Sequence, residues 1–203
     1  PARDRSHDLQ RPHRCSPLCS AHIHQALREQ RTILVICNRV DRAQAVYQAF
    51  MLNKPDDVDC ALLHSRFYGA DRRTIEDQVL RWLGKDEQTG VRRNDGRRKV
   101  VIATQVVEVG LDISADVLLT ECAPAASLIQ RAGRCARWGG AGHVQVFQPP
   151  TDPDQTIPNY APYLDDGLAA VCQRTWSTLS SSSFDGQVLR YDKEQQLVQA
   201  AHE

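Results

Sequence analysis

The chain has 203 residues, of which 41% are hydrophobic and 25% charged, a composition typical of one globular domain with a short appendage. Its apolar runs are far shorter than the roughly 20 residues that a membrane-spanning helix needs, so no transmembrane helix is predicted. Acidic and basic residues balance at 25 each, yet 22 of the basic and 17 of the acidic ones precede residue 141. This asymmetry is only a weak indication of a nucleic-acid partner, because charge alone favours a solvated surface.

The cysteines and the N-terminal segment point to a reduced protein without a metal site. The seven cysteines are odd in number and scattered, which favours buried thiols of a cytoplasmic protein over a disulfide framework. Cys15, Cys19, His22 and His24 lie close together, but without the loop that separates two ligand pairs in structural zinc sites. Residues 1–19 have no hydrophobic periodicity, no apolar leader and no initial methionine. We therefore expect a linker or disordered lead-in within a fragment of a longer protein.

Apolar strands alternate with amphipathic helices over residues 20–150. The helices are expected at 21–30, 41–51 and 71–82, with Ser20, Asp41 and Asp71 as their caps. The strands are expected at 32–38, 59–65, 99–104, 115–121 and 143–149. This alternation predicts an α/β fold, a parallel sheet with helices on both faces.

Two segments lack this alternation. Residues 84–98 end in a basic cluster, and a flexible solvated insertion is expected there, the alternative being a tether for nucleic-acid phosphates. Residues 151–203 begin with a proline-rich linker and continue as a mainly helical tail. In that tail we expect helices at about 163–179 and 193–203 and a strand-like or turn segment at 184–192.

Polar residues cluster where a parallel sheet binds ligands, beyond the carboxyl ends of its strands. These are Asn38 and Arg39 after the first strand, His64–Phe67 after the second and Thr104–Gly110 after the third. Further on, Gln130, Arg134 and Arg137 are spaced to form one stripe of a helix. An exposed helix with several arginines is common and could simply be solvated. That interpretation is less favoured because a strand end beside the helix carries Thr104, Gln105, Glu108, Gly110 and Asp112.

Four segments resemble, in the right order, the motifs of the second lobe of superfamily 2 helicases. They are TILVICN (32–38), LLHSRF (62–67), VVIATQVVEVGLDI (100–113) and QRAGRCAR (130–137). The resemblance covers residues 20–150 and implies a RecA-like lobe, the helicase C-terminal domain. In detail the motifs are most similar to the CRISPR-associated helicase-nuclease of type I systems, the Cas3 family, although that family often carries a serine where Gly110 stands. RecG-related translocases and DEAD-box proteins match less well.

The resemblance implies roles for residues at a cleft between two lobes. Arg134 and Arg137 would be arginine fingers that stabilise charge on the γ-phosphate during phosphoryl transfer. The other nucleotide contacts would come from Gly110 and Asp112, at the ribose or the turn beside it, and from Gln130 and Arg131, which would couple the helix to the opposite lobe. The backbone of a single DNA strand would be held by Asn38, His64, Ser65, Arg66, Thr104 and Gln105.

Two parts of an ATPase are missing from these 203 residues. The sequence has no GxxxxGK[ST] loop and no strand that ends in a DExx box, so ATP and Mg²⁺ would be held mainly by a first RecA-like lobe in the same or a partner chain. The resemblance thus implies half of an ATP-dependent single-stranded DNA helicase, inactive alone, that works with a CRISPR-guided surveillance complex in the cytoplasm. The alternatives are a degenerate or free-standing lobe that serves as a nucleic-acid or protein adaptor, and the same lobe of a different superfamily 2 DNA or RNA helicase.

Overall fold

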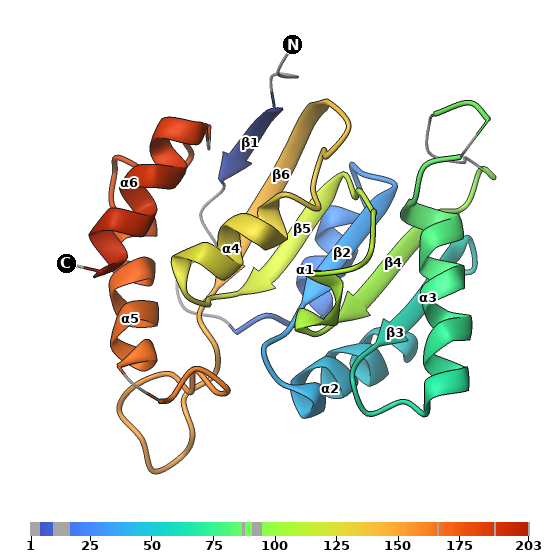
Figure 1. Ribbon diagram of the computed structural model, residues 1–203. Helices are drawn as coiled ribbons and strands as arrows, with labels where there is room; N and C mark the ends of the chain where they lie inside the picture. The colour runs from blue at the N-terminus through green and yellow to red at the C-terminus, as the bar shows by residue number, and fades with distance from the viewer. Residues whose placement is uncertain are drawn as a thin grey trace.

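Six parallel strands form one sheet at the centre of the computed structural model (Figure 1). It describes residues 5–9, 17–86, 88–90, 95–165, 167–188 and 190–202. The strands are β1 (Arg5–Leu9), β2 (Thr32–Ile36), β3 (Val58–Leu63), β4 (Arg98–Ala103), β5 (Val117–Glu121) and β6 (Gly140–Phe147). They lie in the order β1-β6-β5-β2-β4-β3, and each neighbouring pair is parallel. The predicted α/β fold with a parallel sheet is therefore confirmed.

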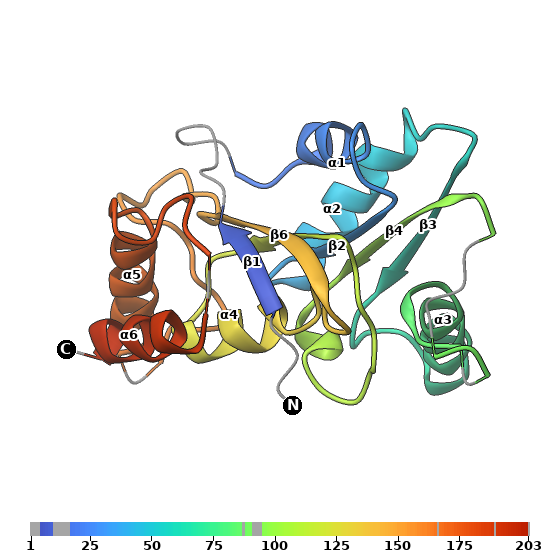
Figure 2. The same cartoon turned by 90° about the horizontal axis from the view of Figure 1, so that it is seen from above.

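Helices cover both faces of the sheet (Figure 2). They are α1 (Ser20–Ala26), α2 (Val40–Met51), α3 (Gly69–Leu83), α4 (Ala125–Ala132), α5 (Leu168–Leu179) and α6 (Tyr191–His202). One face packs against α1 and α2, the other against α3 and α4, and the tail helices α5 and α6 lie beside α4.

Strand β2 shows why the fold needs uninterrupted apolar runs. All five of its residues are buried, because neighbours pair with it on both sides and helices cover both faces. Ile33 and Val35 join the core under α1 and α2, whereas Leu34 and Ile36 join the core under α3 and α4. Successive side chains of a strand point to opposite faces, so a strand in the middle of such a sheet has no polar face.

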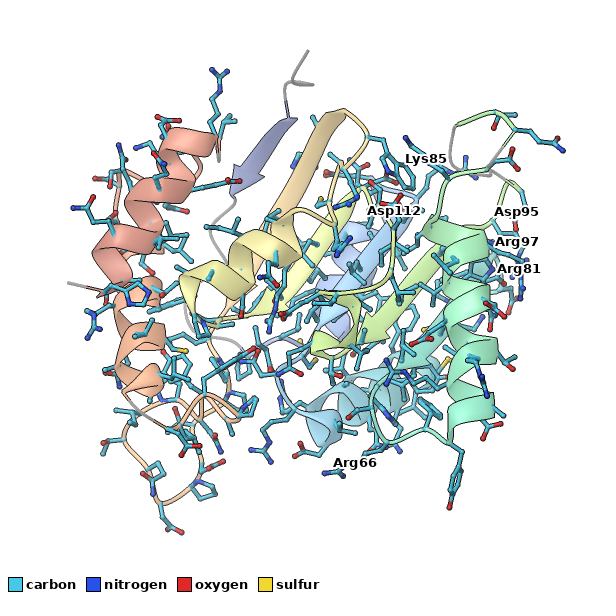
Figure 3. The ribbon with its side chains drawn as sticks, viewed as in Figure 1. Arg66, Arg81, Lys85, Asp95, Arg97 and Asp112 are labelled. Carbon is cyan, nitrogen blue, oxygen red and sulfur yellow. The ribbon has the colours of Figure 1, made fainter. Side chains whose placement is uncertain are left out.

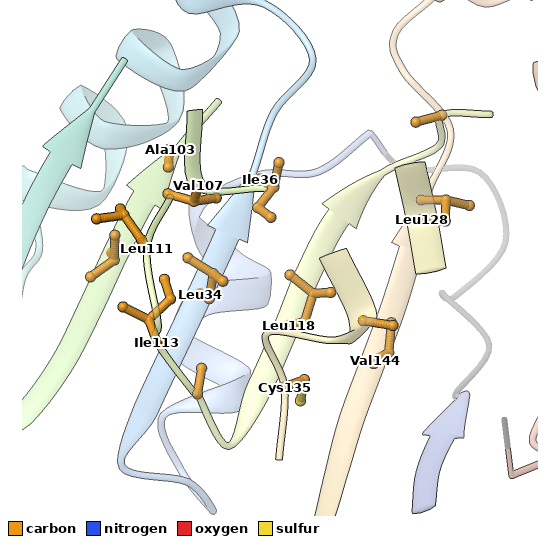
Figure 4. Packing of buried hydrophobic residues seen from close by; sticks show 14 of the residues in the cluster. Leu34, Ile36, Ala103, Val107, Leu111, Ile113, Leu118, Leu128, Cys135 and Val144 are labelled. Carbon is orange, nitrogen blue, oxygen red and sulfur yellow. The ribbon is translucent and has the colours of Figure 1, made fainter. Parts of the chain in front are cut away.

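The crossover from β4 to β5 contains no α-helix. It begins with a short 3-10 helix, η1 (Gln105–Val107), and continues as irregular chain. Val107, Leu111 and Ile113 are buried against the sheet and anchor this segment (Figure 4), in the same core as residues of α3 and α4. The residues between those anchors are consequently held near the surface, and Val109 is 77% exposed.

Several local expectations need correction. Residues 5–9 of the expected lead-in form β1, which pairs in parallel with β6. A strand at the edge of a sheet can be held by backbone hydrogen bonds alone, so its sequence need not contain the apolar run that predicts an inner strand.

The predicted helix caps also differ. Asp41 and Asp71 are not caps but lie in the first turns of α2 and α3, where a negative charge still interacts favourably with the helix dipole. Ser20 likewise lies inside α1, whose N-cap is Cys19.

The described ranges contain no helix with both the length and the apolarity that a bilayer crossing requires. They also contain no group of three or more histidine, cysteine, aspartate or glutamate side chains that could hold a metal ion. Cys15, one of the four potential ligands near the N-terminus, lies outside the described residues.

Candidate functional site

The residues predicted to contact nucleic acid gather at the carboxyl edge of the sheet. Asn38, His64 and Thr104 follow β2, β3 and β4, which are neighbours in the sheet. All three are nevertheless buried, with 3%, 3% and 2% of their surfaces exposed. Ser65 and Arg66 are exposed, and Arg66 projects from this edge at the bottom of Figure 3. The surface that a ligand can reach at this edge therefore includes Ser65 and Arg66, with the buried residues beneath it.

His64 is held in place by its neighbours. Its Nδ1 accepts the backbone N–H of Arg66 at 3.3 Å, and its Nε2 lies 3.3 Å from the side-chain amide of Gln44. Its ring stacks on Phe67, with 4.2 Å between ring centroids and 12° between planes. Burial lowers the pKa of His64 below its ordinary value. The imidazole is therefore a neutral support for the turn that carries Ser65 and Arg66.

Asn38 is the junction of a buried polar network. Its backbone N–H donates to the carboxylate of Glu121 at 2.8 Å, and its side-chain amide donates to the carbonyl oxygen of Cys122 at 2.8 Å. Its own carbonyl oxygen accepts the side-chain amide of Gln105 at 2.7 Å. Glu121 is only 1% exposed and also accepts Nε of Arg42 at 3.0 Å. A buried carboxylate requires this kind of pairing.

Arg131 is fully buried, with 0% of its surface exposed. Its guanidinium donates to Glu108 Oε1 at 2.8 Å, Asn38 Oδ1 at 3.0 Å, Thr120 Oγ1 at 2.9 Å, the carbonyl oxygen of Glu121 at 3.0 Å and the hydroxyl of Tyr163 at 3.0 Å. The side chain predicted to face a nucleotide and a second lobe thus faces the interior of this lobe. Arg131 can therefore affect a bound nucleotide only indirectly, by positioning the residues to which it is hydrogen-bonded.

Arg134 and Arg137 do not continue the helix that was predicted for them. Helix α4 ends at Ala132 with Gly133 as its C-cap, and both arginines lie in the turn that follows. Gly133 is a poor helix former, and Cys135 instead bridges to Ala115 before β5. Gln130, the third member of the expected stripe, is exposed on α4.

The guanidinium of Arg134 is fixed by the crossover between β4 and β5. It donates to the carbonyl oxygen of Leu111 at 2.7 Å and to that of Glu108 at 2.5 Å. Among the described side chains no carboxylate forms an ion pair with it. Burial lowers the pKa of Arg134, and the nearby positive charge of Arg137 lowers it further, although an arginine remains protonated in proteins.

Arg137 lies next to the other predicted nucleotide contacts. Its Nε donates to Asp112 Oδ1 at 2.6 Å, and the side chains of Arg137 and Asp112 are 33% and 62% exposed. Gly110, two residues before Asp112, has a φ of 87°, a left-handed conformation that glycine adopts without strain. Asp112 lies near the opposite end of the sheet from Arg66 (Figure 3). The structure thus brings Arg134, Arg137, Gly110 and Asp112 together and separates them from the carboxyl edge.

Sequence reasoning missed Glu121 and Tyr163 as members of the network. A charged residue that ends the apolar strand 115–121 is a usable signal for Glu121, because such a carboxylate must find a partner. Tyr163 follows a proline-rich linker and has no such signal.

The sheet, the irregular crossover and the arginine turn together define a class of protein, the second RecA-like lobe of a superfamily 2 helicase. The chain belongs to the family described as CRISPR-associated nuclease/helicase Cas3, C-terminal, whose family model matches residues 29–139.

Relatives and solved structures agree with this assignment. The CRISPR-associated endonuclease/helicase Cas3 of Escherichia coli (strain K12) is 43% identical over 105 residues, covering 52% of this chain and 11% of that protein. The CRISPR-associated nuclease/helicase Cas3 of Methanothermobacter thermautotrophicus is 29% identical over 177 residues, covering 84% of this chain and 18% of that protein. The crystal structure of T. fusca Cas3-ADP matches with a TM-score of 0.77 and 26% identity, covering 98% of this chain and 24% of that one. The chain therefore spans less than a fifth of the length of these two curated relatives.

Proposed function

We propose that this chain is the second motor lobe of an ATP-dependent single-stranded DNA helicase of CRISPR type I interference. In this role Arg134 and Arg137 act as arginine fingers on a nucleotide that a first RecA-like lobe holds. The lobe supplies charge and strand contacts but does not hydrolyse ATP by itself.

The observation that carries the proposal is the setting of Arg134. Two backbone carbonyl oxygens orient its guanidinium, and among the described residues no carboxylate forms a direct ion pair with it, although Asp112 and Glu108 lie near enough to act on its charge. A cation that is held in place without an ion-pair partner attracts the charge that develops on phosphoryl oxygens. Its partial burial strengthens that attraction, because a low-dielectric setting screens charge less than water does.

Arg137 is the second finger, with Asp112 as its partner while no nucleotide is bound. Their ion pair is well exposed, at 33% and 62% of the two side chains, and exposed pairs contribute little net free energy. Arg137 is therefore able to exchange Asp112 for a phosphate at small cost. Asp112 and Gly110 would then line the ribose side of the nucleotide.

The DNA strand would run along the carboxyl edge. Arg66 and Ser65 are exposed there and would contact phosphates, together with Gln105, while Asn38, His64 and Thr104 shape the edge from below. Contacts of this kind to the backbone bind single strands with little sequence preference.

The cofactors and partners follow from the same proposal. ATP with Mg²⁺ would be held mainly by the first lobe, and T. fusca Cas3 is known in structures with ADP and with ATP. A CRISPR-guided surveillance complex would deliver the DNA. One structural neighbour is part of a CRISPR RNA-guided surveillance complex in a pre-nicking state, although at 24% identity that likeness bears on the fold alone.

The test is an arginine substitution in the longer protein that joins this lobe to a first RecA-like lobe. Arg134→Ala is expected to lower the DNA-stimulated rate of ATP hydrolysis by about 100-fold or more, because a finger stabilises the transition state. Arg81→Ala is the matched control, since Arg81 is an exposed arginine of α3. Near-normal turnover by the Arg134→Ala protein would exclude the finger role and favour an adaptor.

A companion measurement uses the 203-residue chain alone. It should bind single-stranded DNA weakly, with an affinity that falls as salt rises, and show no ATP hydrolysis. Measurable turnover by the purified chain would contradict the division of the active site between two lobes.

A further inference from the structure

The tail that follows the RecA-like sheet reaches into the network around Arg131. Of the five hydrogen-bond acceptors of Arg131, four belong to strand ends or to the β4–β5 crossover, and the fifth is the hydroxyl of Tyr163. Tyr163 lies beyond residues 29–139, the range that the family model matches. Its ring packs against the core under α3 and α4, so its hydroxyl is held towards the guanidinium.

The hydroxyl of Tyr163 is the described acceptor for Nη2 of the Arg131 guanidinium. Nε of Arg131 donates to Glu108, Nη1 donates to strand-end acceptors, and Nη2 donates to Tyr163 at 3.0 Å. A guanidinium that is 0% exposed has no water to replace a lost acceptor. Removing the hydroxyl of Tyr163 therefore leaves Nη2 without its described partner, so that the guanidinium is held at Nε and Nη1 only and less tightly against Glu108.

Glu108 connects this network to Arg134. Its carboxylate accepts Nε of Arg131 at 2.8 Å, and its backbone carbonyl oxygen accepts Nη2 of Arg134 at 2.5 Å. Arg131 thus bonds to the side chain of Glu108 and Arg134 to its backbone, and Glu108 itself lies in the irregular β4–β5 crossover. A change in how Glu108 is held by Arg131 moves the carbonyl that orients Arg134.

We propose that Tyr163 is a positioning residue for the arginine finger Arg134. The hydroxyl of Tyr163 holds Arg131, Arg131 holds Glu108, and Glu108 holds Arg134. The tail thereby sets the geometry of the nucleotide site without touching the nucleotide. This inference rests on the proposed function of Arg134.

Tyr163→Phe in the longer protein tests it, because this change removes one oxygen and keeps the packing of the ring. The kcat of DNA-stimulated ATP hydrolysis should fall about fivefold, the equivalent of one lost hydrogen bond acting in the transition state. KM for ATP should not change, since ground-state binding is left to the first lobe. Tyr160→Phe is the matched control, because Tyr160 is a buried tyrosine three residues earlier and none of the described hydrogen bonds of Arg131 goes to it. The kcat of the Tyr160→Phe protein should equal that of the wild type.

A double-mutant cycle identifies the route. If Tyr163 acts through Glu108, then Tyr163→Phe adds little to the loss of kcat caused by Glu108→Gln, because the neutral amide already weakens the contact between Arg131 and Glu108 through which Tyr163 acts. Additive losses would overturn the inference, and so would an unchanged kcat in Tyr163→Phe with only a lower melting temperature. Arg134→Ala, measured alongside, distinguishes a failure of this inference from a failure of the proposed function. If the Arg134→Ala protein is nearly inactive while the Tyr163→Phe protein has a normal kcat, only the positioning role of Tyr163 fails. If the Arg134→Ala protein is active, the proposed finger role of Arg134 fails as well.

Discussion

At the scale of single residues, buried charge decides how this lobe is organised. Glu121 and Arg131 are 1% and 0% exposed, and each is surrounded by acceptors or donors from segments distant in sequence. They meet at Asn38, whose backbone donates to Glu121 and whose side chain accepts from Arg131. Because an unpaired buried charge is far more costly than a paired one, these three residues hold the ends of β2 and β5 and helix α4 in one arrangement.

Glu121→Ala should therefore be strongly destabilising. It leaves the backbone N–H of Asn38 and the guanidinium of Arg42 without their shared carboxylate, and we expect a loss of about 3–5 kcal/mol in the free energy of unfolding. Urea denaturation of the chain at neutral pH measures it. The comparison is Asp41→Asn, which removes an exposed pair with Arg39, at 35% and 55% side-chain exposure, and should cost less than about 1 kcal/mol. Equal losses in the two variants would contradict this account of Glu121.

At the scale of elements, the turn after α4 is placed by its contact with β6. Gly142 in β6 faces Cys135 and Ala136, which lie between Arg134 and Arg137, the two arginines proposed as fingers. A Cβ at position 142 would come within 2.7 Å of Cys135 Sγ and 2.8 Å of Ala136 Cβ. The Cβ of Ala136 cannot rotate away, and Cys135 is fully buried, so the turn carrying Arg134 and Arg137 requires glycine opposite it.

Gly142→Ala should accordingly destabilise the chain by about 1–3 kcal/mol, the usual cost of overpacking. Gly69→Ala is the matched control, because a Cβ at the first residue of α3 meets nothing within 4 Å and alanine favours the helix. Thermal unfolding of both variants provides the comparison. A Gly142→Ala chain as stable as the Gly69→Ala chain would show that the turn can move away from β6 without cost.

The sequence could predict the sheet because each inner strand is a short apolar run, and parallel order follows from the alternation of strands and helices. It could also place Asn38, His64 and Thr104 at one edge. It could not predict that Arg131 is buried, since that depends on contacts such as the one with Asn38, 93 residues away in the chain. Helical spacing likewise misplaced Arg134 and Arg137, because the bridge between Cys135 and Ala115 ends the helical path. Tertiary contacts of this kind leave no periodic signal.

At the scale of the whole molecule, the two predicted working surfaces lie towards opposite ends of the sheet and are joined by the network between them. The basic residues 97–99 end the segment for which a flexible solvated insertion was expected, with a tether for nucleic-acid phosphates as the alternative, and they are paired with carboxylates. Arg97 pairs with Asp59, Arg98 with Asp57, and Lys99 with both Asp59 and Asp95; Figure 3 labels Arg97 and Asp95 side by side near α3. Residues 91–94 of that insertion lie outside the described residues. Through these pairs the described cations join β4 and the chain before it to β3 and the chain before that strand.

This pairing predicts how the stability of the chain depends on acid. The hydrogen bonds from Arg97, with a further contribution from Lys99, lower the pKa of Asp59 to about 2, compared with an ordinary value of about 3.9. Because the folded pKa is the lower one, the Asp59 carboxylate contributes stability that is fully present above about pH 4 and is lost as the pH falls from about 4 towards 2.

Asp59→Asn should therefore lower the free energy of unfolding at pH 7, and the difference from the wild type should shrink as the pH falls through this window. Urea denaturation at pH 7, 4 and 3 gives the comparison. Asp56→Asn is the control. Asp56 is an exposed aspartate in the turn just before β3, the strand that contains Asp59, and the described ion pairs do not include the Asp56 carboxylate. The difference between this variant and the wild type should stay small at every pH. A difference for Asp59→Asn that is constant from pH 7 to pH 3 would contradict this account, because it would mean that the contacts of Arg97 and Lys99 do not depend on the charge of this carboxylate.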